Sequence, residues 1–137
     1  MKHALDFDLV FEYDSKDSGI ALPIVLKYGQ QEVKLNAKID TGSTFCVFQR
    51  DYGEELGLDI ERGIEEKIAL ANGSFLTTYG HFIQLSMFGL DFEPIAHFAK
   101  YYDFHKNVLG RVGWLNQIKL AIIDYENLLY VSHYNSD

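Results

Sequence analysis

Residues 32–39 alternate strictly between polar and apolar side chains, and this pattern constrains the fold more than any other feature of the chain. The sequence QEVKLNAKI is typical of a strand that is buried on one face only. DTGST follows without a gap. Asp40 therefore stands where a strand ends and a tight turn begins, and Gly42 can take backbone angles that are closed to other residues.

Similar alternating segments, separated by turn residues, predict an all-β protein. Strands are expected at residues 5–13, 20–28, 31–39, 45–49, 64–71, 74–79, 81–88, 92–98, 118–124 and 128–133. Asn72-Gly73 stands between two of these segments and predicts a projecting β-hairpin. Pro23 suggests an edge strand or a bulge, because proline has no amide hydrogen to donate.

One segment, DYGEELGL, has the features of a short helix. Asp51 is expected to be its N-cap, Glu54 the capping-box partner and Gly57 the end. An Asp-Ser-Gly sequence, similar to the Asp-Thr-Gly at residue 40, begins at Asp17, but it follows a polar run rather than an apolar strand. We interpret it as a turn. One or two short helices are expected in all.

Composition narrows the class of protein. A length of 137 residues fits one domain, and 47% hydrophobic with 15% aromatic residues indicates a folded globule. The formal net charge of −8 disfavours binding to nucleic acids or to anionic membranes. No run approaches the ~18 apolar residues of a membrane helix, so a soluble, cytoplasmic protein is expected.

The histidines and the cysteine of the chain show neither the spacing of a metal site nor the surroundings of a catalytic nucleophile. The five histidines have no metal-ligand spacing, and no metal or other cofactor is expected. Cys46 is the single cysteine, which excludes an intrachain disulfide. It lies between two apolar residues, and we interpret it as a buried core thiol rather than a nucleophile.

Three features taken together resemble the retropepsin-like aspartic proteases. They are the apolar strand ending in Asp-Thr-Gly-Ser-Thr, the hairpin downstream of it, and the segment VLGRVGWL at residues 108–115. The resemblance covers residues 22–131 and implies a closed or partly open β-barrel. Residues 1–137 are then one domain, with the N-terminal strand and linker, residues 1–19, outside the resemblance. That strand could pair along a sheet edge or mediate a dimer unlike that of the viral enzymes.

The resemblance also implies roles for the residues around Asp40. Asp40 would be the catalytic residue, and the hydroxyl of Thr41 would bond across a dimer to the opposite loop. Gly42 would let the backbone approach the substrate. The hydroxyl of Ser43 is expected to donate to the carboxylate, which would favour the ionised form and an acidic pH optimum.

Segments further along the chain would complete the site. The hairpin tip, Asn72-Gly73, would belong to a flap that closes over an extended substrate. Val108, Leu109 and Gly110 match the second motif of the family, in which apolar side chains would contact apolar substrate residues. Arg111 matches the basic residue that often follows, and it could be no more than an ion-pair partner beneath the site. Aromatic residues at 101–104 could line a substrate pocket or cover a loop.

Only one such aspartate is present, so a second carboxylate would come from a second copy of the chain across a two-fold axis. We therefore expect a homodimeric aspartic endopeptidase that cleaves extended peptide or protein substrates by paired acid and base catalysis. One alternative is a catalytically inactive retropepsin-like module for dimerisation or peptide binding. Another is a monomer whose half-site is completed by a different protein.

Overall fold

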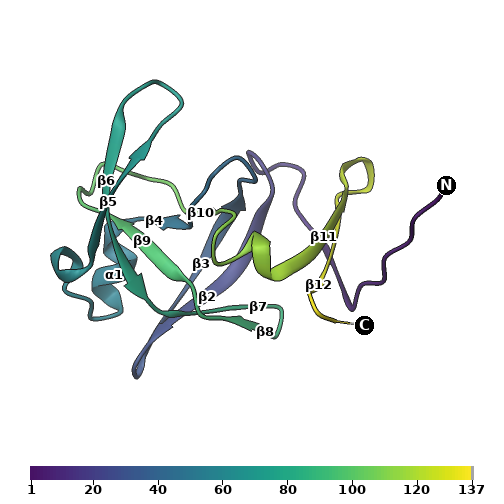
Figure 1. Cartoon of the computed structure of the whole chain (residues 1–137), viewed down its shortest axis with the longest axis horizontal. Coiled ribbons are helices and arrows are strands. Elements are labelled where there is room, and N and C mark those ends of the chain that lie inside the picture. The colour runs from purple at the N-terminus through teal and green to yellow at the C-terminus, as the bar shows by residue number, and fades with distance from the viewer. Residues whose placement is uncertain (137) are drawn as a thin grey trace.

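The computed structural model describes residues 1–136 and contains two β-sheets (Figure 1). The larger sheet has nine strands in the order β5-β6-β9-β4-β10-β3-β2-β7-β8. They are β2 (Ala21–Tyr28), β3 (Gln31–Ile39), β4 (Val47–Phe48), β5 (Ile64–Ala69), β6 (Phe75–Phe82), β7 (Gln84–Met87), β8 (Leu90–Phe92), β9 (Ile95–Ala99) and β10 (Val108–Leu109). The mostly-β class is confirmed. The expected barrel is not confirmed, because within residues 1–136 the larger sheet is open and has β5 and β8 as its two end strands.

The smaller sheet has three antiparallel strands in the order β1-β12-β11. They are β1 (Leu9–Glu12), β11 (Ile118–Ile123) and β12 (Leu128–His133). This sheet lies at the end of the molecule opposite the α-helix (Figure 1). The strand expected at residues 5–13 is therefore shorter than expected, and it pairs with β12 of its own chain.

Short helical segments connect the strands: α1 (Arg50–Glu55), η1 (Ile60–Arg62), η2 (Leu115–Gln117) and η3 (Asp124–Glu126). The N-cap of α1 is Gln49, so the expectation of Asp51 is wrong. Arg50 is already helical, and its Nε lies 3.2 Å from the carboxylate of Glu54. Gly57 ends the helix as expected, with φ of +83°. Among residues 1–136, no helix is long and apolar enough to span a membrane.

The hairpin of β2 and β3 lies in the interior of the larger sheet, between β10 and β7, and leads into Asp40. The alternation in β3 is confirmed, because its apolar side chains are buried up to residue 37 and its polar ones are exposed. Pro23 lies in an interior strand rather than at an edge. It pairs with Asn36 of β3, while β7 reaches only residues 25–27 on the other side of β2. The missing amide of Pro23 therefore costs no hydrogen bond to β7.

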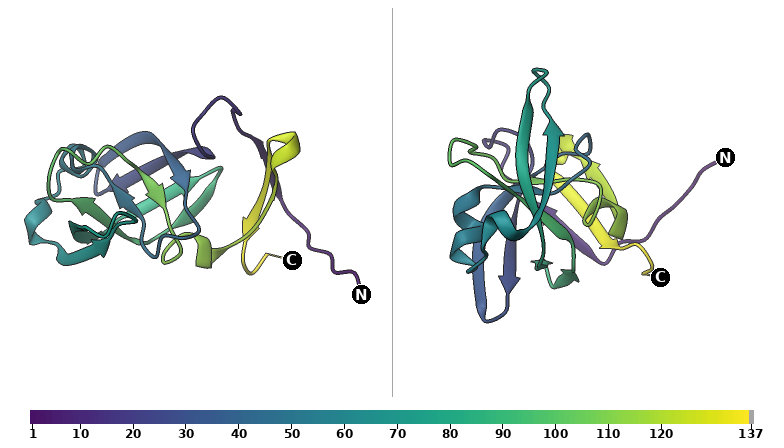
Figure 2. Two further views of the ribbon diagram at one scale, coloured as in Figure 1. Left: turned by 90° about the horizontal axis from the view of Figure 1, so that it is seen from above. Right: turned by 60° about the vertical axis from the view of Figure 1, so that its left-hand side comes forward.

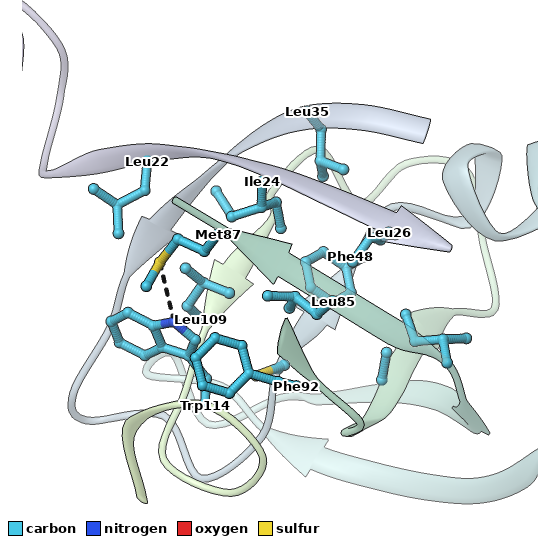
Figure 3. Close-up of a cluster of buried hydrophobic side chains, with 14 of the residues drawn as sticks. Leu22, Ile24, Leu26, Leu35, Phe48, Leu85, Met87, Phe92, Leu109 and Trp114 are labelled. Carbon is cyan, nitrogen blue, oxygen red and sulfur yellow. Dashed lines mark hydrogen bonds between the residues drawn. The ribbon is translucent and has the colours of Figure 1, made fainter. Parts of the chain in front are cut away.

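The core joins both sheets around Trp114, which is fully buried (Figure 3). Its indole Nε1–H donates to the Sδ of Met87 at 3.4 Å. Leu109 of β10 is also fully buried and belongs to the same apolar cluster, as do Leu129 and Val131 of β12. The strands that carry the candidate site are thus fixed on one packed core.

Candidate functional site

Pairing between β3 and β10 brings the two sequence motifs side by side. The strands run parallel, with Val108 opposite Lys38 and Leu109 opposite Ile39. At the end of β3, the amide of Asp40 donates to the carbonyl oxygen of Leu109 at 3.0 Å. The segments around residues 40 and 109 are therefore fixed to one another by backbone hydrogen bonds.

The carboxylate of Asp40 is exposed and is held by its own turn. Its Oδ1 accepts the amide of Gly42 at 3.0 Å, and its backbone carbonyl accepts the amide of Ser43 at 3.1 Å. None of the ion pairs formed within residues 1–136 includes Asp40. The carboxylate is thus positioned but not neutralised by a cation of its own chain.

Gly110 allows the two loops to approach more closely than any side chain would permit. A Cβ at this position would lie 2.2 Å from the carbonyl oxygen of Phe45 and 2.8 Å from that of Ser43. The neighbouring amide of Arg111 donates to the Ser43 carbonyl at 2.9 Å. The amide of Gly110 itself donates to the Sγ of Cys46 at 3.4 Å. The glycine of the second motif is therefore a packing requirement of the site.

Ser43 and Gly42 act differently from what the sequence predicted. The hydroxyl of Ser43 donates to the carbonyl oxygen of Phe45 at 2.8 Å. A hydroxyl has one hydrogen, so the expectation that Ser43 donates to Asp40 is wrong. The φ of Gly42 lies outside the left-handed region, and a Cβ there would lie 3.4 Å from Oδ1 of Asp40, an ordinary contact. The special backbone angle expected at Gly42 is thus not used, and Thr41 lies exposed beside it.

A cleft of about 620 Å³ opens beside Asp40. One wall is the loop at residues 42–45, and the opposite wall is the β5–β6 hairpin at residues 67–71 and 76. Phe104 and Lys106 from the β9–β10 loop also line it. A volume of this size is typical of clefts that bind small molecules or side chains of a peptide.

The predicted projecting hairpin is confirmed, and it stands out from the sheet (Figure 2). The amide of Leu70 donates to the carbonyl of Ser74 at 2.9 Å, and the amide of Gly73 donates to the carbonyl of Leu70 at 3.0 Å. The φ of Gly73 is +86°, which favours glycine. The side chain of Asn72 accepts the amide of Ser74 at 3.0 Å. The Asn-Gly pair therefore builds the tip of the hairpin.

The second motif is divided between the cleft and the core. Val108 lines the cleft, whereas Leu109 is fully buried, so its side chain forms no part of the cleft wall. Arg111 is exposed, and none of the ion pairs within residues 1–136 includes it. Its expected role as an ion-pair partner is thus not observed in this chain.

Sequence reasoning missed two charged residues of the cleft, Lys67 and Lys106. Of the aromatic residues at 101–104, for which two roles were expected, Phe104 lines the cleft. Tyr102 instead lies against helix α1, with its hydroxyl 2.7 Å from the carboxylate of Glu54. Nothing in a single lysine within a loop or an exposed strand indicates that it faces a cleft.

Behind Phe45 lies a buried histidine. The rings of His97 and Phe45 have centroids 4.6 Å apart. His97 Nδ1 lies 3.3 Å from the hydroxyl oxygen of Thr78, which donates its single hydrogen to the carbonyl of Glu66. Nδ1 of His97 must then carry the proton and donate. Burial lowers the pKa of His97, with Glu66 acting in the opposite direction.

Comparisons with known proteins agree with this arrangement. The family model described as aspartyl protease matches residues 24–111, more than half of the chain. A retropepsin-like aspartic protease from Rickettsia conorii is similar in structure, with a TM-score of 0.64 and 18% identity over 90% of this chain and 97% of that chain. EIAV protease complexed with the inhibitor HBY-793 has a TM-score of 0.54 and 17% identity, over 72% of this chain and 86% of that chain. No curated protein matches the chain in sequence. The fold is retropepsin-like.

Proposed function

This chain belongs to the aspartyl protease family, and we propose that it is an aspartic endopeptidase active as a homodimer. Each copy contributes one Asp40 to a shared pair of carboxylates. The substrate is an extended peptide segment that occupies the cleft between the Asp40 loop and the β5–β6 hairpin, which we call the flap. No metal or other cofactor takes part in the proposed reaction.

The chemistry follows from placing two carboxylates close together. At about 3 Å they cannot both ionise, so they hold one proton between them, as aspartic proteases do in general. The charged member accepts a proton from water while the water oxygen attacks the peptide carbonyl carbon. The protonated member donates a hydrogen bond to the carbonyl oxygen. The tetrahedral diol that forms then breaks its C–N bond as the nitrogen takes up the proton that the carboxylate received from water. An amine and a carboxylic acid result, without a covalent intermediate.

The observation that carries this proposal is the state of Asp40 in the single chain. Its carboxylate is exposed at the edge of a cleft, is held by the Gly42 amide, and has no ion-pair partner within residues 1–136. Asp17, in the Asp-Ser-Gly segment, lies in an exposed turn rather than at the end of a strand. One chain therefore offers half of a catalytic pair, and a second copy supplies the other half.

The neighbouring residues have supporting roles in this proposal. Thr41 is exposed next to Asp40, where its hydroxyl can bond to the same loop of the partner. Ser43 and Gly110 keep the Asp40 loop packed against the second motif, and Val108 contacts an apolar side chain of the substrate. The flap tip at Asn72-Gly73 closes over the bound segment and excludes water.

Cleavage of an unfolded protein between pH 3 and pH 7 tests the proposal directly. The wild type should cleave it, and Asp40→Asn should reduce the rate by at least about 10²-fold, because an amide cannot exchange a proton in this step. Sedimentation of both proteins under the same conditions measures whether they form dimers. Asp51→Asn, an exposed carboxylate on α1, is the matched control and should keep full activity.

The outcomes separate the alternatives. Activity that survives in Asp40→Asn would exclude the proposed chemistry. An active wild type that is strictly monomeric would exclude the homodimer. A dimer that binds peptides but cleaves none of them would be the catalytically inactive module.

A further inference from the structure

Two lysines from different parts of the chain line the cleft beside Asp40. Lys67 belongs to strand β5 of the flap, and Lys106 belongs to the loop between β9 and β10. The remaining charged residue along this cleft, within residues 1–136, is Asp40 itself. The whole chain carries a net charge of −8. The cleft is thus a cationic site on a strongly anionic protein.

Both ammonium groups are available to a ligand. Lys67 and Lys106 are exposed, and neither takes part in the ion pairs formed within residues 1–136. Arg50 shows the contrasting case, because it is largely covered and binds the carboxylate of Glu61 at 2.6 Å. Within residues 1–136, no carboxylate forms an ion pair with Lys67 or Lys106 in the way that Glu61 does with Arg50.

The backbone around Lys106 is fixed relative to Asp40. The next residue, Asn107, accepts the amide of Lys38 through its carbonyl at 2.8 Å. Its side-chain Oδ1 accepts the amide of Gln49 at 3.0 Å. These bonds connect the loop to β3, which leads directly into Asp40, and to the start of α1. The backbone of Lys106 is therefore held at a fixed position beside the site.

The other walls of the cleft are mostly apolar: Ile68, Leu70, Leu76, Phe104 and Val108. An adjoining hollow of about 570 Å³ shares Leu70, Phe104 and Lys106 with the cleft. Asp103 and His105 line that hollow but not the cleft. An occupant of the cleft thus meets apolar surface and two positive charges, with the one carboxylate at the reacting centre.

We propose that Lys67 and Lys106 make the enzyme select segments in which an aspartate or glutamate stands among apolar residues close to the scissile bond. This inference rests on the proposed function. A carboxylate covered by the flap gains from the two ammonium groups, whereas a lysine at the same position is repelled. The negative charge of the rest of the surface disfavours binding of acidic peptides anywhere else.

The first experiment measures this preference with matched peptides. Digestion of an unfolded protein, followed by mass spectrometry, gives the cleavage positions and the residue most enriched near them. Three peptides are then made that carry Glu, Gln or Lys at this enriched position and are otherwise identical, and their kcat/KM values are compared at pH 6. Glu should exceed Gln by about fivefold, and Lys should be worst. At pH 3 the glutamate is protonated, so the advantage over Gln should disappear.

Charge reversal then assigns the preference to the cleft. Lys106→Glu should turn the order around, so that the Lys peptide becomes better than the Glu peptide, and Lys67→Glu should act in the same direction. Lys16→Glu changes the net charge equally but lies in an exposed turn away from the cleft, and it should leave the order unchanged. Fluorescence anisotropy of labelled peptides on Asp40→Asn measures the same preference without catalysis.

The results distinguish this inference from the proposed function. If the wild type cleaves Glu, Gln and Lys peptides equally well, the acidic preference is excluded while the protease assignment stands. If nothing is cleaved but Asp40→Asn and wild type both bind the Glu peptide more tightly than the Gln peptide, the cleft preference is supported and the enzyme assignment fails. A preference that survives unchanged in both lysine variants would overturn the inference.

Discussion

The amide of Asp40 donates to the carbonyl oxygen of Leu109 at 3.0 Å, and this bond joins the two sequence motifs of the candidate site. Leu109 is fully buried in the core, while Asp40 is exposed at the cleft. The backbone that carries the Asp40 carboxylate is therefore one hydrogen bond away from the packed interior. Such support from regular structure is what a site needs to hold its geometry.

Gly110→Ala tests the close approach of the two loops. The new methyl group would lie 2.2 Å from the carbonyl oxygen of Phe45, so one loop must shift. We expect a loss of about 1–3 kcal/mol in the free energy of unfolding, measured by urea denaturation, together with loss of cleavage. Gly42→Ala is the control, because its φ is not left-handed and its methyl has room. It should change stability by less than about 1 kcal/mol. Equal stability of the two variants would contradict this packing argument.

Met87→Leu tests the buried bond between Trp114 and Met87. Leucine has a similar volume but offers no acceptor, so the indole N–H of Trp114 loses its partner. We expect a loss of about 1 kcal/mol or more in unfolding free energy. In a Trp114→Phe background, which has no N–H, the same substitution should cost clearly less. Because that background has no tryptophan, circular dichroism should follow unfolding in all four proteins. An equal cost in both backgrounds would assign no role to the bond.

The buried His97 predicts that stability falls in mild acid. Burial lowers its pKa below the value of 6.5 that it has when unfolded, so the folded chain binds this proton less readily. The contribution is complete above pH 6.5 and is lost as the pH falls through the lowered value. Glu66 opposes the shift, and His81 adds to it. Urea denaturation between pH 5 and pH 7 should show this slope, and His97→Gln should flatten it. An identical slope in the variant would exclude His97 as the cause.

Cys46 predicts a loss of stability at the alkaline side. Burial raises its pKa from 9.0 to about 11, although the amide of Gly110 lowers it in part. The unfolded thiol ionises first, so stability should fall as the pH rises above 9. Tyr13, with a pKa raised to about 12 by burial and by its bond to Asp124, contributes only at higher pH. Between pH 8.5 and pH 10, Cys46→Ala should therefore show a flatter slope than the wild type. Rapid alkylation of native Cys46 at pH 8 would contradict its burial.

Much of the strand pattern could be predicted from the sequence because it follows from local chemistry. The alternation in residues 31–39 and the Asn72-Gly73 turn both specify their structure within a few residues. Gly57 ends α1 for the same reason. The prediction of Asp51 as the N-cap was wrong because Arg50 is held in the first turn by Glu54 and by the distant Glu61. The contact with Glu61 cannot be recognised from the few residues around the helix start.

The rest of the site depends on contacts between segments that are far apart in the chain. The hydroxyl of Ser43 donates to the Phe45 carbonyl because of the path that residues 43–45 take, and a short stretch of sequence does not specify that path. Lys67 and Lys106 meet at the cleft because of the pairing of β5 with β6 and the anchoring of Asn107. Neighbouring side chains of a strand point to opposite faces, so in the two-residue strand β10 the side chain of Leu109 is buried while that of Val108 lines the cleft.

The central claim is that two copies of the chain share one pair of carboxylates, and a mixing experiment tests it most directly. Wild type is equilibrated with a ninefold excess of Asp40→Asn, and cleavage is measured per wild-type chain at constant total protein. If random dimers form and only those with two Asp40 carboxylates are active, the activity should fall to about a tenth of that of pure wild type. Activity per wild-type chain that is unchanged by the excess would contradict the shared site.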